Sequence, residues 1–267
     1  MSIFENFFRL SVFSLVRDRF LYLLFSLALI ALLLIPAFSM FSMRQVQELS
    51  VTLCLSALSF LLLVVTVLTG SSSLWRDIEK RYTFSVLGLP VSRAGFVLGK
   101  FSAVALLLAV VAAVFGAGSF AAIKVAAGVY PSDIPVAWGV FCAAVAFDVL
   151  KYLMLLAILF FLSALSTSFY FPFLAGIAVF IAGSASQEVY EYVQGAYGKG
   201  ITPAAKAVIT GIYYLLPNFA AFDLHPHAIY ALPVPPGGAL LTFVYWLCYT
   251  GVMLSLAVWS FSRRELT

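Results

Sequence analysis

The sequence predicts an all-α integral membrane protein with six transmembrane helices. Two observations predict it: the overall composition and the spacing of the charged residues. Of 267 residues, 64% are hydrophobic and only 10% are charged, and the mean hydropathy is +1.09. A soluble domain carries about 25% charged residues. A chain of 29.0 kDa cannot enclose this much apolar surface in a core of its own, so lipid must solvate much of it.

The charged residues divide the chain into apolar runs of transmembrane length. As a helix, a run of ~20 residues crosses a hydrocarbon core of ~30 Å. The predicted spans are residues 20–41, 51–69, 101–123, 137–162, 169–184 and 239–261. No soluble domain or tandem repeat is evident between them, so we expect a single transmembrane domain over 1–267.

The N-terminal residues 1–19 are predicted to form an interfacial helix before the first span. Their apolar residues recur at near-helical spacing, and Glu5, Arg9 and Arg17 lie between them. Such a pattern is typical of a helix that lies on the membrane surface. A frayed N-terminus is the alternative.

The segment 187–238 is predicted to lie on the extracytoplasmic side. Within it, residues 204–216 are apolar but too short to cross the bilayer, which favours a re-entrant or partial helix before the last span. A seventh span here would place Arg263 and Arg264 outside, against the positive-inside rule.

The distribution of Lys and Arg predicts that both termini are cytoplasmic. Ten of the 15 basic residues fall on the side of the termini, four fall on the opposite side, and Lys151 lies within a span. The excess marks the cytoplasmic side. Because these charges lie between apolar runs, the basic pI of about 9.0 does not indicate nucleic-acid binding.

One pair of opposite charges lies inside a predicted span. Asp148 and Lys151 are three residues apart, on one face of the fourth span, and can neutralise each other. Charged residues within the membrane are functional candidates by default. Two interpretations stay open: an ion pair that fixes packing, and a pair that lines a transport path.

Few other residues indicate chemistry. His225 and His227 flank Pro226 and supply at most half of a metal site. The sequence has no phosphate-binding glycine loop and no Ser-His-Asp pattern. We therefore expect no catalytic site, no metal and no cofactor in this chain.

The cytoplasmic loop 71–100 has the most ordered polar pattern. A charged cluster ends in Ile-Glu-Lys-Arg at 78–81, a short amphipathic stretch follows, and Pro-Val-Ser-Arg at 90–93 leads to Gly-Lys at 99–100. Proline can end a short helix, and the serine can cap the next helix. A compact charged helix of this kind suits docking to a soluble partner.

This loop resembles that of the permease subunits of type-2 ABC exporters, in the branch with an Ile-Glu-Lys-Arg loop. Ser-Ala-Leu-Ser-Thr at 163–167 and Tyr-Leu-Leu-Pro-Asn at 214–218 agree with the same family, and the resemblance covers the chain in span order. The chain departs from the Glu-x-Gly-Thr found in many members, because Lys-Arg-Tyr-Thr stands at 80–83.

The resemblance implies a permease subunit in the cytoplasmic (inner) membrane of a prokaryote. Two copies, or one copy and a similar permease, would form the pathway above two ABC ATPase subunits that bind ATP and Mg. It implies an ATPase-coupling role for Arg76, Asp77, Glu79, Lys80, Arg81 and Arg93, and more loosely for Phe7 and Phe8. It implies an outer gate at Tyr214, Leu216, Pro217 and Asn218. It leaves the transported substrate open.

Two other classes of function compete with this one. A secondary transporter would use Asp148 and Lys151 as a proton or ion relay and would need no ATPase. A polytopic membrane enzyme would need convergent acid, base or metal groups at one membrane depth, and the sequence indicates no such cluster.

Overall fold

A computed structural model describes residues 3–17, 19–42, 45–79, 93–129, 135–166, 168–195 and 200–263. These residues form helices joined by short connections. The elements are α1 (Ile3–Val16), α2 (Arg19–Ser39), α3 (Val46–Glu79), α5 (Arg93–Val129), α6 (Trp138–Leu165), α7 (Tyr170–Gln194), α8 (Pro203–Leu215), the 3-10 turn η2 (Ala220–Phe222), α9 (His225–Ile229) and α10 (Pro236–Arg263).

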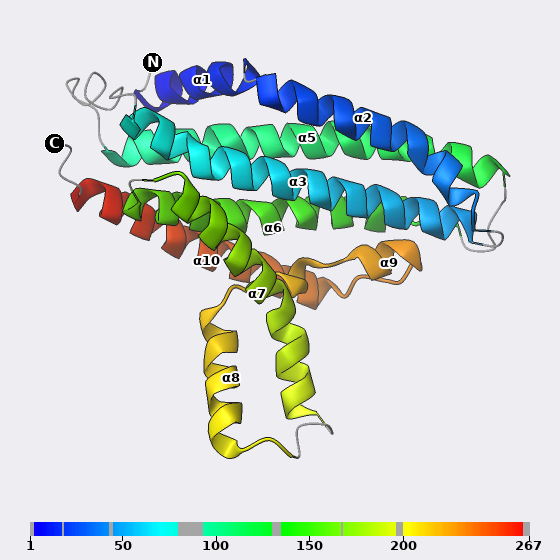
Figure 1. Cartoon of the computed structure of the whole chain (residues 1–267). Helices are drawn as coiled ribbons and strands as arrows, with labels where there is room; N and C mark the ends of the chain where they lie inside the picture. Colours follow the sequence, from blue (N-terminus) through cyan, green and yellow to red (C-terminus); the bar gives the residue numbers. More distant parts are fainter. Residues whose placement is uncertain are drawn as a thin grey trace.

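Six of the described helices are long and apolar enough to cross a membrane, as the sequence predicts: α2, α3, α5, α6, α7 and α10. Five of them run side by side as a bundle, and α7 crosses this bundle obliquely (Figure 1). The two ends of the described chain lie at the same end of the bundle (Figure 1), as an even number of crossings requires. The chain is therefore a multi-pass helical membrane protein.

The helices α3 and α5 are longer than the predicted spans 51–69 and 101–123. At 1.5 Å per residue, their 34 and 37 residues extend about 51 and about 56 Å, well beyond a hydrocarbon core of ~30 Å. α3 also begins at Val46, five residues before the predicted start of the second span at residue 51. Hydropathy marks only the lipid-embedded part of a helix, and no proline stops α3 or α5 where the sequence becomes polar.

The predicted N-terminal helix is present as α1, which packs against α5. It lies in line with α2 at the end of the bundle where both termini are found (Figure 1). Its position at the membrane surface stays a prediction.

A helix, α8, is present within a residue of the bounds expected for the partial helix, and its outer, re-entrant position stays a prediction. It lies beside the second half of α7, and the two project together from the side of the bundle (Figure 1). α8 and the following η2–α9 segment are bent by 54° relative to each other, so that together they resemble a broken span or a re-entrant loop. The fifth span is also longer than predicted, because α7 continues to Gln194.

The core is centred on α6, which packs against α3, α5, α7 and α10. Its residues 154–160 are almost entirely buried, whereas only about a tenth of α10 is buried. A second apolar cluster surrounds α9, where Leu224 and Ala228 pack among residues of α3, α5 and α6. Lipid or other helices are needed to cover the remaining apolar surface.

Candidate functional site

The predicted pair of charges in the fourth span forms a direct contact. Asp148 is fully buried in α6, and its Oδ1 accepts a hydrogen bond from Lys151 Nζ at 2.6 Å. Asp148 lies ten residues into α6, which is about 15 Å from its first residue. An isolated ion at such a depth is costly, and a close partner offsets this cost.

The second oxygen of Asp148 binds a residue that is distant in sequence. His225 Nε2 lies 2.9 Å from Asp148 Oδ2. His225 is the first residue of α9, and its backbone N–H donates to Asp223 Oδ1 at 3.0 Å. This contact ties the segment between α8 and α10 to the fourth span.

Lys151 also has a second partner, on α3. Its Nζ donates to Ser59 Oγ at 3.1 Å, and Ser59 Oγ is 2.7 Å from the Tyr152 hydroxyl. The Lys151 ammonium lies 4.9 Å from the centre of the Tyr152 ring. Asp148, Lys151, His225, Ser59 and Tyr152 therefore form one polar network that joins α3, α6 and α9, which we call the buried network.

The sequence predicts the pair within α6 but not the link of Asp148 to His225. Histidines 225 and 227 suggested at most half of a metal site, and the structure uses the first of them as a partner for Asp148. Within the described part of the chain, no three His, Cys, Asp or Glu residues gather closely enough to hold a metal ion. The signal in the sequence that points to a further partner is general: both oxygens of a carboxylate buried within a span need hydrogen-bond partners, and Lys151 supplies a partner for one of them.

A second polar cluster is centred on Asn218, one of the predicted gate residues. Its side-chain Nδ2 donates to Gln187 Oε1 at 3.1 Å and to the Tyr213 hydroxyl at 3.3 Å. Its backbone N–H donates to the Tyr245 hydroxyl at 2.9 Å, and its Oδ1 accepts from the backbone of Ala221. Asn218 therefore connects α7, α8, η2 and α10.

A cavity of about 410 Å³ adjoins this cluster. Tyr214, Leu216 and Asn218 line it, together with residues of α10 that include Tyr245. Pro217, the remaining predicted gate residue, is buried and does not line the cavity. The lining is aromatic and apolar with a few hydroxyl and amide groups, and it contains no charged side chain.

The predicted ATPase-coupling residues lie where α3 ends and α5 begins. Arg76, Asp77 and Glu79 belong to the last turns of α3, and Arg93 is the first residue of α5. Lys80 and Arg81, together with the expected short helix and proline break, lie outside the described residues.

Contacts join this end of the bundle to two other helices. Arg93 Nη1 donates to the carbonyl of Ser262 at 2.6 Å, near the end of α10, and the Phe96 and Phe261 rings stack at 5.7 Å. Trp75 of α3 contacts Phe169, just before α7, with ring centres 5.7 Å apart. A cation close to the last carbonyls of a helix is favoured by the helix dipole.

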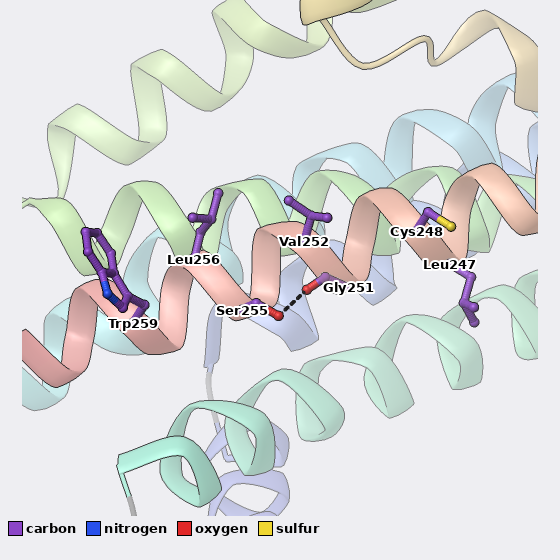
Figure 2. Close-up of a pocket in the computed structure, with 7 residues that line it drawn as sticks. All are labelled: Leu247, Cys248, Gly251, Val252, Ser255, Leu256 and Trp259. Atoms are coloured by element: carbon purple, nitrogen blue, oxygen red, sulfur yellow. Dashed lines mark hydrogen bonds between the residues drawn. The ribbon is translucent and has the colours of Figure 1, made fainter.

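The outward face of α10 carries an open hollow of about 710 Å³. Figure 2 shows its lining along a single helix. The residues are Leu247, Cys248, Gly251, Val252, Ser255, Leu256 and Trp259. Ser255 Oγ donates to the Gly251 carbonyl at 2.7 Å, so its hydroxyl is satisfied within the helix. Small residues four apart allow close approach of another helix or of a lipid chain.

No protein-family model matches the chain, and a search of curated proteins finds no match. The functional conclusion therefore depends on the residues and their arrangement.

Proposed function

We propose that the chain is the membrane-spanning subunit of an ATP-binding-cassette exporter, which moves a substrate across the cytoplasmic membrane. The resemblance of the loop 71–100 to such permeases supports this proposal. The single structural observation that carries it furthest is the length of α3 and α5, the two helices that bracket the segment 80–92. Their 34 and 37 residues exceed the ~20 that cross a hydrocarbon core, so their neighbouring ends would extend beyond the bilayer, where a soluble partner could reach them.

The contacts at this end offer a route from an ATPase to the spans. A displacement of α3 would act on α7 through Trp75 and Phe169, and a displacement of α5 would act on α10 through Arg93 and Ser262. The ATPase would dock on a surface of charged residues. These are Arg76, Asp77, Glu79, Lys80 and Arg81, together with Arg93 at the start of α5.

The outer gate would lie at the Asn218 cluster. Asn218 joins four elements, so a relative movement of α7 and α10 would break several of its hydrogen bonds together. The uncharged lining of the adjoining cavity suits a substrate that is neutral where it contacts this surface.

The assembly would contain two permease chains and two ATPase subunits, each ATPase binding ATP and Mg. The second permease would be another copy of this chain or a similar one. It would lie in the inner membrane of a prokaryote, with both termini cytoplasmic, and this chain would have no catalytic site of its own.

Charge reversal in the coupling segment tests the proposal. Glu79→Lys combined with Arg81→Glu preserves net charge but inverts the docking pattern, so we expect loss of most of the ATPase stimulation by the permease and loss of transport. The measurement is ATP hydrolysis by the reconstituted complex with the ATPase that co-purifies with the chain.

The matched control inverts two charges away from this end, with Lys124→Glu combined with Glu188→Lys. This variant should retain stimulation. The proposal is wrong if the first variant inserts normally and keeps both stimulation and transport, or if no ATPase co-purifies.

A secondary transporter is the second candidate, and the observation in its support is the kind of residues that the buried network contains. Asp148 is a fully buried carboxylate with a lysine and a histidine beside it, which is the kind of group that carries protons or ions through membranes. Such a protein would transport in response to an ion gradient without an ATPase, so flux into vesicles that lack ATP distinguishes the two.

A further inference from the structure

The imidazole of His225 lies between two carboxylates. Its Nε2 is 2.9 Å from Asp148 Oδ2, and its Nδ1 is 3.7 Å from Asp223 Oδ1. The three side chains differ sharply in exposure: Asp148 is fully buried, His225 is 18% exposed and Asp223 is 51% exposed. The imidazole therefore connects a carboxylate inside the bundle to one that is half exposed at its surface.

Carboxylates face this imidazole from two sides. The charged groups on the elements packed against α9 are Asp148 and Lys151 of α6 and, among the described residues at the start of α3, Glu48. Lys151 and Asp148 neutralise each other in the buried network. The charge of a protonated His225 would balance that of Asp223, so Asp148, Lys151, His225 and Asp223 together would carry no net charge. A carboxylate would then face each ring nitrogen of His225.

A neutral imidazole would fit less well. It carries one N–H and one acceptor nitrogen. With the N–H on Nε2 facing Asp148, the lone pair on Nδ1 would face the Asp223 carboxylate, which is repulsive. A charge-assisted hydrogen bond to Asp148 is also stronger than a neutral one.

The proton on His225 would control how firmly α9 is held. Apart from this contact, α9 is held mainly by apolar packing, in which Leu224 and Ala228 are buried against α3, α5 and α6. The helix has only five residues and would have little stability outside the bundle. Weakening the His225–Asp148 contact therefore favours its release.

We propose that His225 is a proton-binding site between Asp148 and Asp223, and that the bound proton locks α9 into the bundle. An imidazole that loses its proton loses the charge-assisted hydrogen bond, so the contact that holds α9 is stronger in acid than in alkaline medium. This role is separate from the proposed export and requires no ATPase, because it concerns only whether α9 stays packed against the bundle.

Thiol labelling in lipid nanodiscs tests this site on the full chain without any partner. The native cysteines are first replaced by alanine. Ala228→Cys then places a thiol at a position that is 2% exposed beneath α9, and Tyr230→Cys places the matched control at a position that is 58% exposed. The ratio of the two maleimide rates corrects for the ionisation of thiols with pH.

We expect the rate at position 228, relative to position 230, to rise at least about tenfold between pH ~5.5 and ~8, the change that follows loss of one charge-assisted hydrogen bond. His225→Gln should abolish this pH dependence. Asp223→Asn, at an exposed side chain that should not disturb folding, should reduce it.

If the ratio of the maleimide rates at positions 228 and 230 does not change with pH in the protein with the native His225, the proposal is wrong. The His225–Asp148 contact then holds α9 equally well whether or not His225 is protonated. The same holds if His225→Gln or Asp223→Asn leaves the pH dependence unchanged. Because no ATPase is present, these outcomes are independent of the test of export.

Discussion

Asp148 is buried with both carboxylate oxygens engaged, by Lys151 within its own helix and by His225 from α9. Lys151 in turn reaches Ser59 of α3. The geometry favours the structural interpretation of the pair over a lining role, because each charged group is already held by partners from two elements. A polar network within a membrane protein stabilises only when its members are satisfied together.

The pair predicts a rescue by double substitution. Asp148→Asn or Lys151→Met alone leaves one charge buried without its partner, which costs about 3–5 kcal/mol. The two changes together remove both charges, while the amide can still accept from His225. We expect each single variant to lower membrane yield and thermal midpoint, and the double variant to regain most of both.

Lys124→Met, at an exposed position of α5, is the control and should leave both measurements unchanged. A double variant that folds but no longer transports would show that the pair lines the path. A double variant that stays unfolded would show that neither residue depends mainly on the other.

At the scale of the elements, six spans and the partial helix could be predicted from hydropathy and length. The extent of α3 and α5 could not, because their polar ends continue as helix in sequence that hydropathy assigns to a loop. The His225–Asp148 contact could not be predicted either, since the partners are 77 residues apart with three elements between them, and neither residue carries a local signal for the other.

The crossing of α7 over the segment after α8 depends on a glycine. A Cβ at Gly183 would collide with the backbone carbonyl of Pro217, and would lie 2.8 Å from the Phe219 ring. A backbone atom cannot move away as a flexible side chain can, so Gly183 sets how closely α7 approaches the predicted gate.

Gly183→Ala should therefore destabilise the protein by about 1–3 kcal/mol, as overpacking does. Gly211→Ala is the matched control, because no atom lies within 4 Å of its added Cβ on α8. It should be neutral or stabilise by about 0.5–1 kcal/mol through helix propensity. Thermal unfolding in detergent compares the two, and equal midpoints would show that α7 and the 217–219 segment are not in close contact.

At the scale of the whole molecule, the bundle places both ends of the described chain together and leaves α8 and α10 largely uncovered (Figure 1). α8 has no buried residue, and among the described residues only those of α10 line its hollow (Figure 2). Lipid or another membrane protein can cover such faces. The distribution of basic residues predicts that the shared end of the termini lies in the cytoplasm.

This orientation predicts a pattern of labelling in intact cells. With the native cysteines replaced by alanine, cysteine at Leu10 or Ser262 should be protected from an impermeant maleimide until the membrane is permeabilised. Cysteine at Thr202 or Tyr230 should react at once, because this orientation would place the α8–α9 segment outside. All four of these residues are exposed, so protection would report the side of the membrane rather than burial. Opposite results for Leu10 and Ser262 would mean that α8 and α9 together cross the membrane as a seventh span, whereas a reversal at all four positions would mean that the charge rule fails for this chain.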